Sequence, residues 1–142
     1  MKRLLFGLAL LTLAACESTT VSADDVHLAT GRDAYVRSPA GVAEIDYAVV
    51  NESDRQALLP VCGETVLVGV ERRVGGAWVE QGVYVCQTLA VYAPLLLEPG
   101  GGRVDARVPL QEPGRYRLVL HLIPPGDEEP GAVLRSAPFT IE

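Results

Sequence analysis

Basic residues are scarce in this sequence of 142 residues. Its 12 Lys and Arg stand against 18 Asp and Glu, which gives a net charge of −6 at pH 7. Nucleic-acid binding depends on clustered basic side chains that meet phosphates. The charge balance therefore argues against a nucleic-acid partner.

Motifs for metal binding and catalysis are also missing. Met1 is the only methionine, and neither Cys-x-x-Cys nor His-x-x-x-His occurs, so the usual copper and zinc ligand spacings are absent. The Gly-x-Ser-x-Gly motif of serine hydrolases is missing, and no Lys-Ser/Thr pair follows Gly100-Gly101-Gly102 to complete a phosphate loop. We expect no metal, no cofactor and no catalytic residues, and we interpret the glycine triplet as a turn between strands.

The apolar run near the N-terminus is too short to span a bilayer. It extends from Leu4 to Leu13, whereas a transmembrane helix needs about 20 residues. Lys2 and Arg3 precede it, and the small residues Ala14 and Ala15 follow it. This order predicts an export signal peptide.

The end of that signal, Leu13-Ala14-Ala15-Cys16, resembles the lipoprotein box of bacteria. The resemblance implies a signal peptide over 1–15, a Cys16 thiol that carries diacylglycerol, and membrane lipid as a partner. Glu17 favours an outer-membrane protein that faces the periplasm, by the sorting rule of enteric bacteria. The alternative is an ordinary signal peptide with an incidental cysteine.

Residues 16–25 are small and polar and predict a flexible tether. Cleavage before Cys16 would remove Lys2 and Arg3, leaving 10 basic and 18 acidic residues and a net charge of −8. No basic segment would then remain beside the anchor, so attachment would depend on the acyl chains.

From Val26 onward, apolar residues alternate with polar ones, the period of strands with one wet face. The sequence also has 14 Gly and 10 Pro, and Gly75-Gly76 is typical of a two-residue hairpin turn. We predict an all-β fold over 26–142, a β-sandwich of about seven strands. The alternating runs are 43–49, 66–70, 103–110 and 115–122.

The segment from Glu112 to Leu118 resembles the entry to strand F of immunoglobulin folds. In such folds a tyrosine hydroxyl bonds back to the backbone at the corner, a role that Tyr116 would take here. The alternative makes Tyr116 an ordinary core aromatic. Leu118 stands where the immunoglobulin cysteine would be. A wider set of features resembles bacterial immunoglobulin-like (Ig-like) domains, which share a fold and no common activity: Asn51-x-Ser53, Cys62, Glu71-Arg72-Arg73, Gly76-x-Trp78-Val79, Cys86, Leu97 to Gly100 and Ser136 to Ile141.

Two cysteines remain once Cys16 is acylated. For an exported protein, the pair Cys62 and Cys86 predicts a disulfide. It would connect the hairpin that carries Trp78 to the segment after it.

The aromatic side chains Trp78, Tyr84 and Tyr92 lie near one another in sequence and could form a platform for a glycan or a peptide. The alternative, which is the favoured interpretation of Trp78, is that it caps the core. The run Leu95-Leu96-Leu97 leaves Leu96 either covered by a loop or exposed as a contact patch. Three acids lie in the Pro-rich loop 124–131, either as a solvated tip or as a contact site: Asp127, Glu128 and Glu129.

These features favour a lipid-anchored Ig-like module of the bacterial cell envelope that serves in binding or structural support, with an envelope protein or a glycan as partner. The alternative function is inhibition of a protease or another enzyme through the loop 124–131.

Overall fold

The computed structural model describes residues 25–83, 93–124 and 131–142. Within these ranges the chain forms strands and turns without any helix, so the all-β prediction is confirmed. The same ranges contain no helix that is long and apolar enough to cross a bilayer. The strands, in order, are β1 (Val26–Thr30), β2 (Ala34–Tyr35), β3 (Ala43–Asn51), β4 (Ala57–Leu59), β5 (Val61–Cys62), β6 (Thr65–Val66), β7 (Gly69–Val74), β8 (Ala77–Val83), β9 (Leu95–Leu97), β10 (Gly102–Leu110), β11 (Gly114–His121), β12 (Val133–Arg135) and β13 (Phe139–Ile141).

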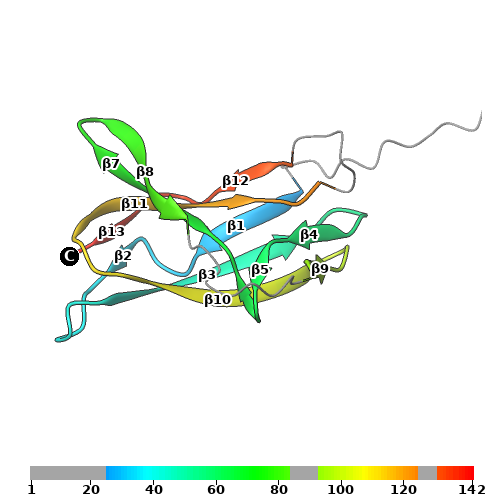
Figure 1. The fold of residues 1–142 in the computed structure, drawn as a ribbon, viewed down its shortest axis with the longest axis horizontal. Coiled ribbons are helices and arrows are strands. Elements are labelled where there is room, and N and C mark those ends of the chain that lie inside the picture. Colours follow the sequence, from blue (N-terminus) through cyan, green and yellow to red (C-terminus); the bar gives the residue numbers. More distant parts are fainter. Residues whose placement is uncertain (1–24, 84–92, 125–130) are drawn as a thin grey trace, which may run out of the picture.

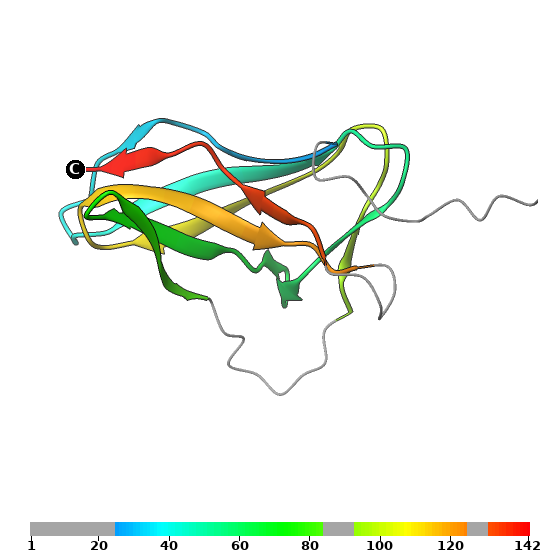
Figure 2. The ribbon, with the colours of Figure 1, turned by 90° about the horizontal axis from the view of Figure 1, so that it is seen from above.

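Two sheets pack face to face (Figures 1 and 2). The first has the order β1-β3-β10, and the second has the order β2-β13-β11-β7-β8, with β12 also pairing with β11. The N-terminal segment contributes a strand to each sheet. β1 pairs with β3 in the first sheet, and β2 pairs in parallel with β13 in the second. This arrangement is a β-sandwich, consistent with the predicted Ig-like fold.

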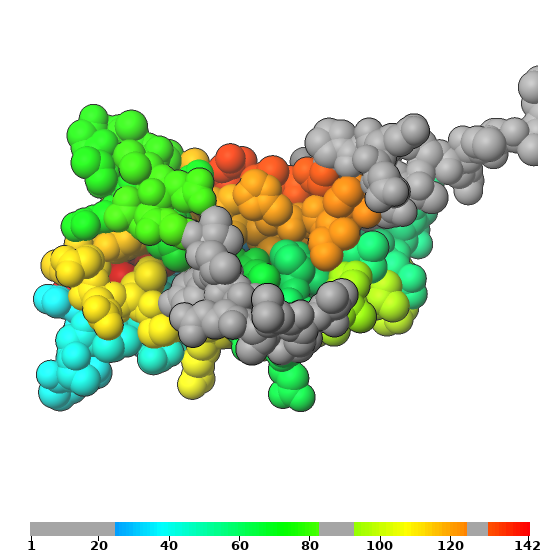
Figure 3. All heavy atoms as spheres, in the orientation of Figure 1, coloured from blue at the N-terminus to red at the C-terminus, as the bar shows by residue number. Residues whose placement is uncertain are grey.

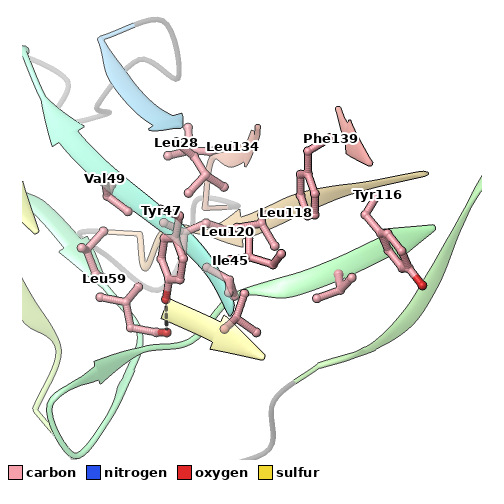
Figure 4. Packing of buried hydrophobic residues seen from close by; sticks show 14 of the residues in the cluster. Leu28, Ile45, Tyr47, Val49, Leu59, Tyr116, Leu118, Leu120, Leu134 and Phe139 are labelled. Atoms are coloured by element: carbon pink, nitrogen blue, oxygen red, sulfur yellow. Dashed lines mark hydrogen bonds between the residues drawn. The ribbon is translucent and has the colours of Figure 1, made fainter. Parts of the chain in front are cut away.

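The core lies between the two sheets and follows the predicted alternation. Ile45 and Val49 of β3 and Leu118 and Leu120 of β11 are each 0% exposed, and they interleave in the centre of the sandwich (Figure 4). Burial of each such side chain contributes about 1.5–3 kcal/mol.

Tyr116 closes the corner at which the chain enters β11. Its ring is 3% exposed, and its hydroxyl donates a 2.9 Å hydrogen bond to the carbonyl oxygen of Glu112. Leu118, the next inward residue, fills the core. The predicted tyrosine corner is therefore confirmed.

Two of the predicted turns are also confirmed. Gly75 and Gly76 join β7 to β8 with φ of +57° and +87°, and two successive positive φ angles define a type I′ hairpin turn. The glycine triplet joins β9 to β10.

The strand count differs from the prediction of about seven. The described ranges contain thirteen strands, of which six have five or more residues. Short strands arise where backbone groups form hydrogen bonds outside the regular pairing of two strands. The run 66–70 divides because the Leu67 amide donates to Pro60, and Ser136 separates β12 from β13 by accepting the Leu118 amide on its hydroxyl.

Candidate functional site: the outer face of β11, β7 and β8

Arginine side chains and one tryptophan lie on the outer face of the second sheet. Figure 3 shows the β7–β8 hairpin in green and the end of β11 in orange at the surface of the molecule. Alternation along β11 buries Tyr116 and Leu118 and turns Arg115 and Arg117 outward. Strand pairing places side chains of β7, β8 and β12 beside them, since residues opposite each other share a face. We call this surface the arginine–tryptophan face, and its members are Glu71, Arg73, Trp78, Glu80, Arg115, Arg117 and Arg135.

Trp78 is half-buried on this face and is not part of the core cluster. The guanidinium carbon of Arg117 lies 4.5 Å from the centre of its ring, and that of Arg73 lies 5.3 Å away, both within cation–π range. The structure thus contradicts the alternative in which Trp78 caps the core. Trp78 points outward because it lies opposite Arg73, which also points outward. Arg72, the residue before Arg73, points inward, and its guanidinium lies over the Tyr116 ring.

Arg117 is fixed from two sides. Besides its contact with the Trp78 ring, its Nε donates a hydrogen bond to Oε2 of Glu71. The two charged side chains are only 22% and 17% exposed, so solvent screens this pair less than a surface pair. Arg117 therefore holds the ring of Trp78 in place, and Glu71 balances its charge.

Three other arginines on the face have no acidic partner among the described residues. Arg73 comes just after Arg72 and Arg115 just before Tyr116, the last pair between the antiparallel strands β7 and β11. Arg135 lies opposite Val119. All three are exposed. With four arginines and two glutamates, the face carries a net positive charge in a chain whose net charge is −6.

The outer face of the first sheet is different, because every arginine there has an acidic partner. Arg103 contacts Asp105 at 2.6 Å, and Arg107 contacts Asp46 at 2.5 Å. The hydrogen bond from Arg103 holds the pKa of the Asp105 carboxyl below its ordinary value. An open hollow of about 880 Å³ lies on this side, and both arginines that line it are already paired with carboxylates of the chain.

A smaller hollow of about 400 Å³ adjoins the arginine–tryptophan face. Glu71, Glu80 and His121 are among the residues that line it. Val119 lines it too and is only 6% exposed, although it occupies an outward position on β11.

Several predicted site residues lie outside the described ranges. They are Cys16, Tyr84, Cys86, Tyr92, Asp127, Glu128 and Glu129. Cys62, on β5, is disulfide-bonded, and its pairing with Cys86 stays a prediction. The grouping of Trp78 with Tyr84 and Tyr92 and any role of the loop 124–131 also remain predictions.

The described residues settle two further points. Leu96 is 52% exposed, which agrees with the contact-patch alternative and not with cover by a loop.

His27 contacts Glu52 at 3.2 Å at the surface, and His121 is at the end of β11. No group of three His, Cys, Asp or Glu that could hold a metal ion occurs in the part of the chain that the structure describes.

The arrangement around Trp78 went unrecognised in the sequence. Arg117 falls in the predicted alternating run 115–122, but Glu71 lies 46 positions earlier in the sequence. Only the pairing of β7 with β11 brings them together. Alternation shows which way a side chain points and does not show which strands become neighbours.

Comparison with known proteins assigns no family to this chain. No protein-family model matches the chain, and no curated protein matches it in sequence. Structures of a β-glucosidase from Listeria innocua match 82% of this chain and 16% of their own: the glucose complex at 13% identity with a TM-score of 0.38, and the enzyme alone at 14% and 0.35. The chain thus spans about a sixth of the β-glucosidase length, and these scores establish no enzymatic activity for it.

Proposed function

We propose that this protein is a lipid-anchored module of the bacterial cell envelope that binds or supports another envelope component and does not catalyse a reaction. The support for the anchor is the sequence Leu13-Ala14-Ala15-Cys16 behind a basic and an apolar segment. The support for a binding role is the surface of the sandwich.

We choose the arginine–tryptophan face as the binding surface because of the position of Trp78. Trp78 is a large aromatic side chain kept out of the core, held by Arg117 and accompanied by exposed arginines. Tryptophan and arginine are the residues most enriched among those that dominate binding energy at interfaces. Arg117 is itself fixed by Glu71, so the ring is ordered before a partner arrives, which lowers the entropic cost of binding.

The anchor is tested by replacing Cys16 with serine. In cells fed a labelled fatty acid, the unaltered protein should carry label and the Cys16→Ser variant should carry none. Processing before residue 16 should also stop in the variant. An unmodified Cys16 in the unaltered protein, detected by mass spectrometry, would show that the anchor proposal is wrong.

The binding face is tested by photo-crosslinking in living cells. A benzophenone amino acid replaces Glu80, an exposed member of the face, or Thr140, which is exposed beside Arg115. Glu44 and Ala29 on the first sheet are the matched control positions. We expect covalent adducts from positions 80 and 140 and few from 44 and 29. Adducts from the controls alone, or from none of the four, would contradict the proposal.

A further inference from the structure

We infer that the arginine–tryptophan face binds an anionic saccharide chain, whose carboxylate or phosphate groups meet Arg73, Arg115 and Arg135 beside the ring of Trp78. This inference rests on the proposed function, since it names the ligand class for the same face.

Charge complementarity is the first argument. Arg32, Arg103 and Arg107 each contact a carboxylate of the chain, whereas Arg73 and Arg115 contact none among the described residues. Unpaired arginines at neighbouring positions repel each other, and a bound anion relieves that repulsion. A guanidinium also presents a planar fork of donors that fits carboxylate and phosphate oxygens.

The spacing of these arginines suits a linear ligand. Arg115 and Arg117 are two residues apart on one strand, which places their Cα atoms about 6.8 Å apart. Arg73 lies on the adjacent strand β7, about 4.8 Å away in the direction of pairing. Arg135 extends the row past β11 on the other side. The positive charges therefore follow a band across the sheet instead of a single deep pocket.

The acidity of the whole chain narrows the class of ligand. A wide anionic surface, such as a bilayer or a nucleic acid, would also meet acidic side chains on a protein with a net charge of −6 and would be repelled. A narrow chain can lie on the band alone, because salt screens charges beyond about 8 Å. Trp78 adds an apolar ring and an indole N–H donor beside the arginines, an amphipathic surface suited to a sugar ring.

Trp78 is also the only tryptophan in the sequence, so its fluorescence reports directly on this face. The full chain, purified in a non-ionic detergent, would be titrated with polygalacturonate as the carboxylate probe, with phosphorylated dextran as the phosphate probe and with neutral dextran. We expect a saturable change in Trp78 emission with one or both anionic polymers and none with dextran. Raising the salt concentration from 50 to 500 mM should weaken binding.

A matched pair of variants separates a local effect from a general one. Arg73→Gln/Arg115→Gln and Arg103→Gln/Arg107→Gln remove the same charge from opposite faces of the sandwich. The first should weaken binding roughly tenfold or more, because two charge-assisted contacts are lost. The second should change it less than about twofold.

Equal weakening by both double variants, or equal binding of dextran, would overturn the inference. So would binding to phosphatidylglycerol vesicles without binding to either anionic polymer. If these results coincide with crosslinks from positions 80 and 140, only the ligand class is wrong. If the crosslinks are missing as well, the proposed function fails with it.

Discussion

Asn51 is fully buried and organises the loop that follows β3. Its side-chain nitrogen donates to the carbonyl oxygens of Arg55 at 2.7 Å and Leu97 at 3.0 Å. Its side-chain oxygen accepts from the amide and the hydroxyl of Ser53. Asn51-Glu52-Ser53 also matches the acceptor sequence for N-glycosylation, but the buried, fully bonded amide is inaccessible to that modification.

Replacement of Asn51 with alanine should reduce the free energy of unfolding by about 3 kcal/mol, because buried carbonyl groups lose their donors. Urea unfolding monitored by circular dichroism measures this loss. Asn51→Asp is the informative control: it keeps the acceptor for Ser53 but removes the donors, so it should also destabilise the protein. A loss below about 0.5 kcal/mol in the alanine variant would contradict this role.

Two buried tyrosines make stability sensitive to alkali. Burial raises the pKa of Tyr35 and of Tyr116 above the ordinary value of 10.0. The unfolded chain then loses these protons first as the pH rises, so their contribution is fully present below pH 10 and declines as the pH passes through the folded-state pKa.

We therefore expect the urea midpoint to be steady between about pH 8 and 9 and to fall above pH 10. The fall should be smaller in Tyr35→Phe/Tyr116→Phe, which cannot ionise at these positions. An unchanged alkaline slope in the double variant would show that other groups cause the loss.

At the scale of elements, the β7–β8 hairpin decides where Trp78 lies. Its turn fixes the pairing of Arg73 with Trp78. Further along, β8 contains a β-bulge: Gln81 is an extra residue, because Val70 lies opposite Gly82 and Glu71 lies opposite Glu80. Bulges of this kind twist an edge strand and hinder pairing with another chain. β8 is the edge strand of its sheet among the described residues. The hairpin therefore places Trp78 on the outer face of the sheet, and its bulge hinders pairing of β8 with another chain.

The turn itself offers a sharp test. Gly75→Asn should leave the free energy of unfolding nearly unchanged, because Asn-Gly is a favoured type I′ pair. Gly75→Val should cost about 1–2 kcal/mol, because a β-branched residue resists positive φ. Equal stability of the two variants, measured by urea unfolding, would argue against the positive φ at Gly75.

At the scale of the whole molecule, the fold was largely readable from the sequence and the candidate site was not. The alternation of apolar and polar residues predicted which side chains of β11 point inward. The turn residues predicted the Gly75-Gly76 hairpin, and the resemblance to immunoglobulin folds predicted the corner at Tyr116. Trp78 was ambiguous, because its side depends on the register of β7 against β8 and on the pairing of β7 with β11. Both are long-range choices that alternation leaves open.

The same scale shows how charge is divided over the sandwich. Arginines on the first sheet are neutralised by acids on the same face, whereas the arginine–tryptophan face keeps its positive charge within an acidic chain. This asymmetry gives the molecule one side suited to an anionic partner. It is the physical basis for proposing recognition as the function.

The most direct test compares two variants by partner capture after formaldehyde crosslinking in cells. One is Trp78→Ala; the other is His27→Ala/His121→Ala, which removes both histidines of the sequence. Both should unfold cooperatively in urea, a check that the sandwich is intact. We predict that Trp78→Ala loses most of the captured partner and that the histidine variant captures as much as the unaltered protein. Loss of capture with the histidine variant and full capture with Trp78→Ala would contradict this prediction.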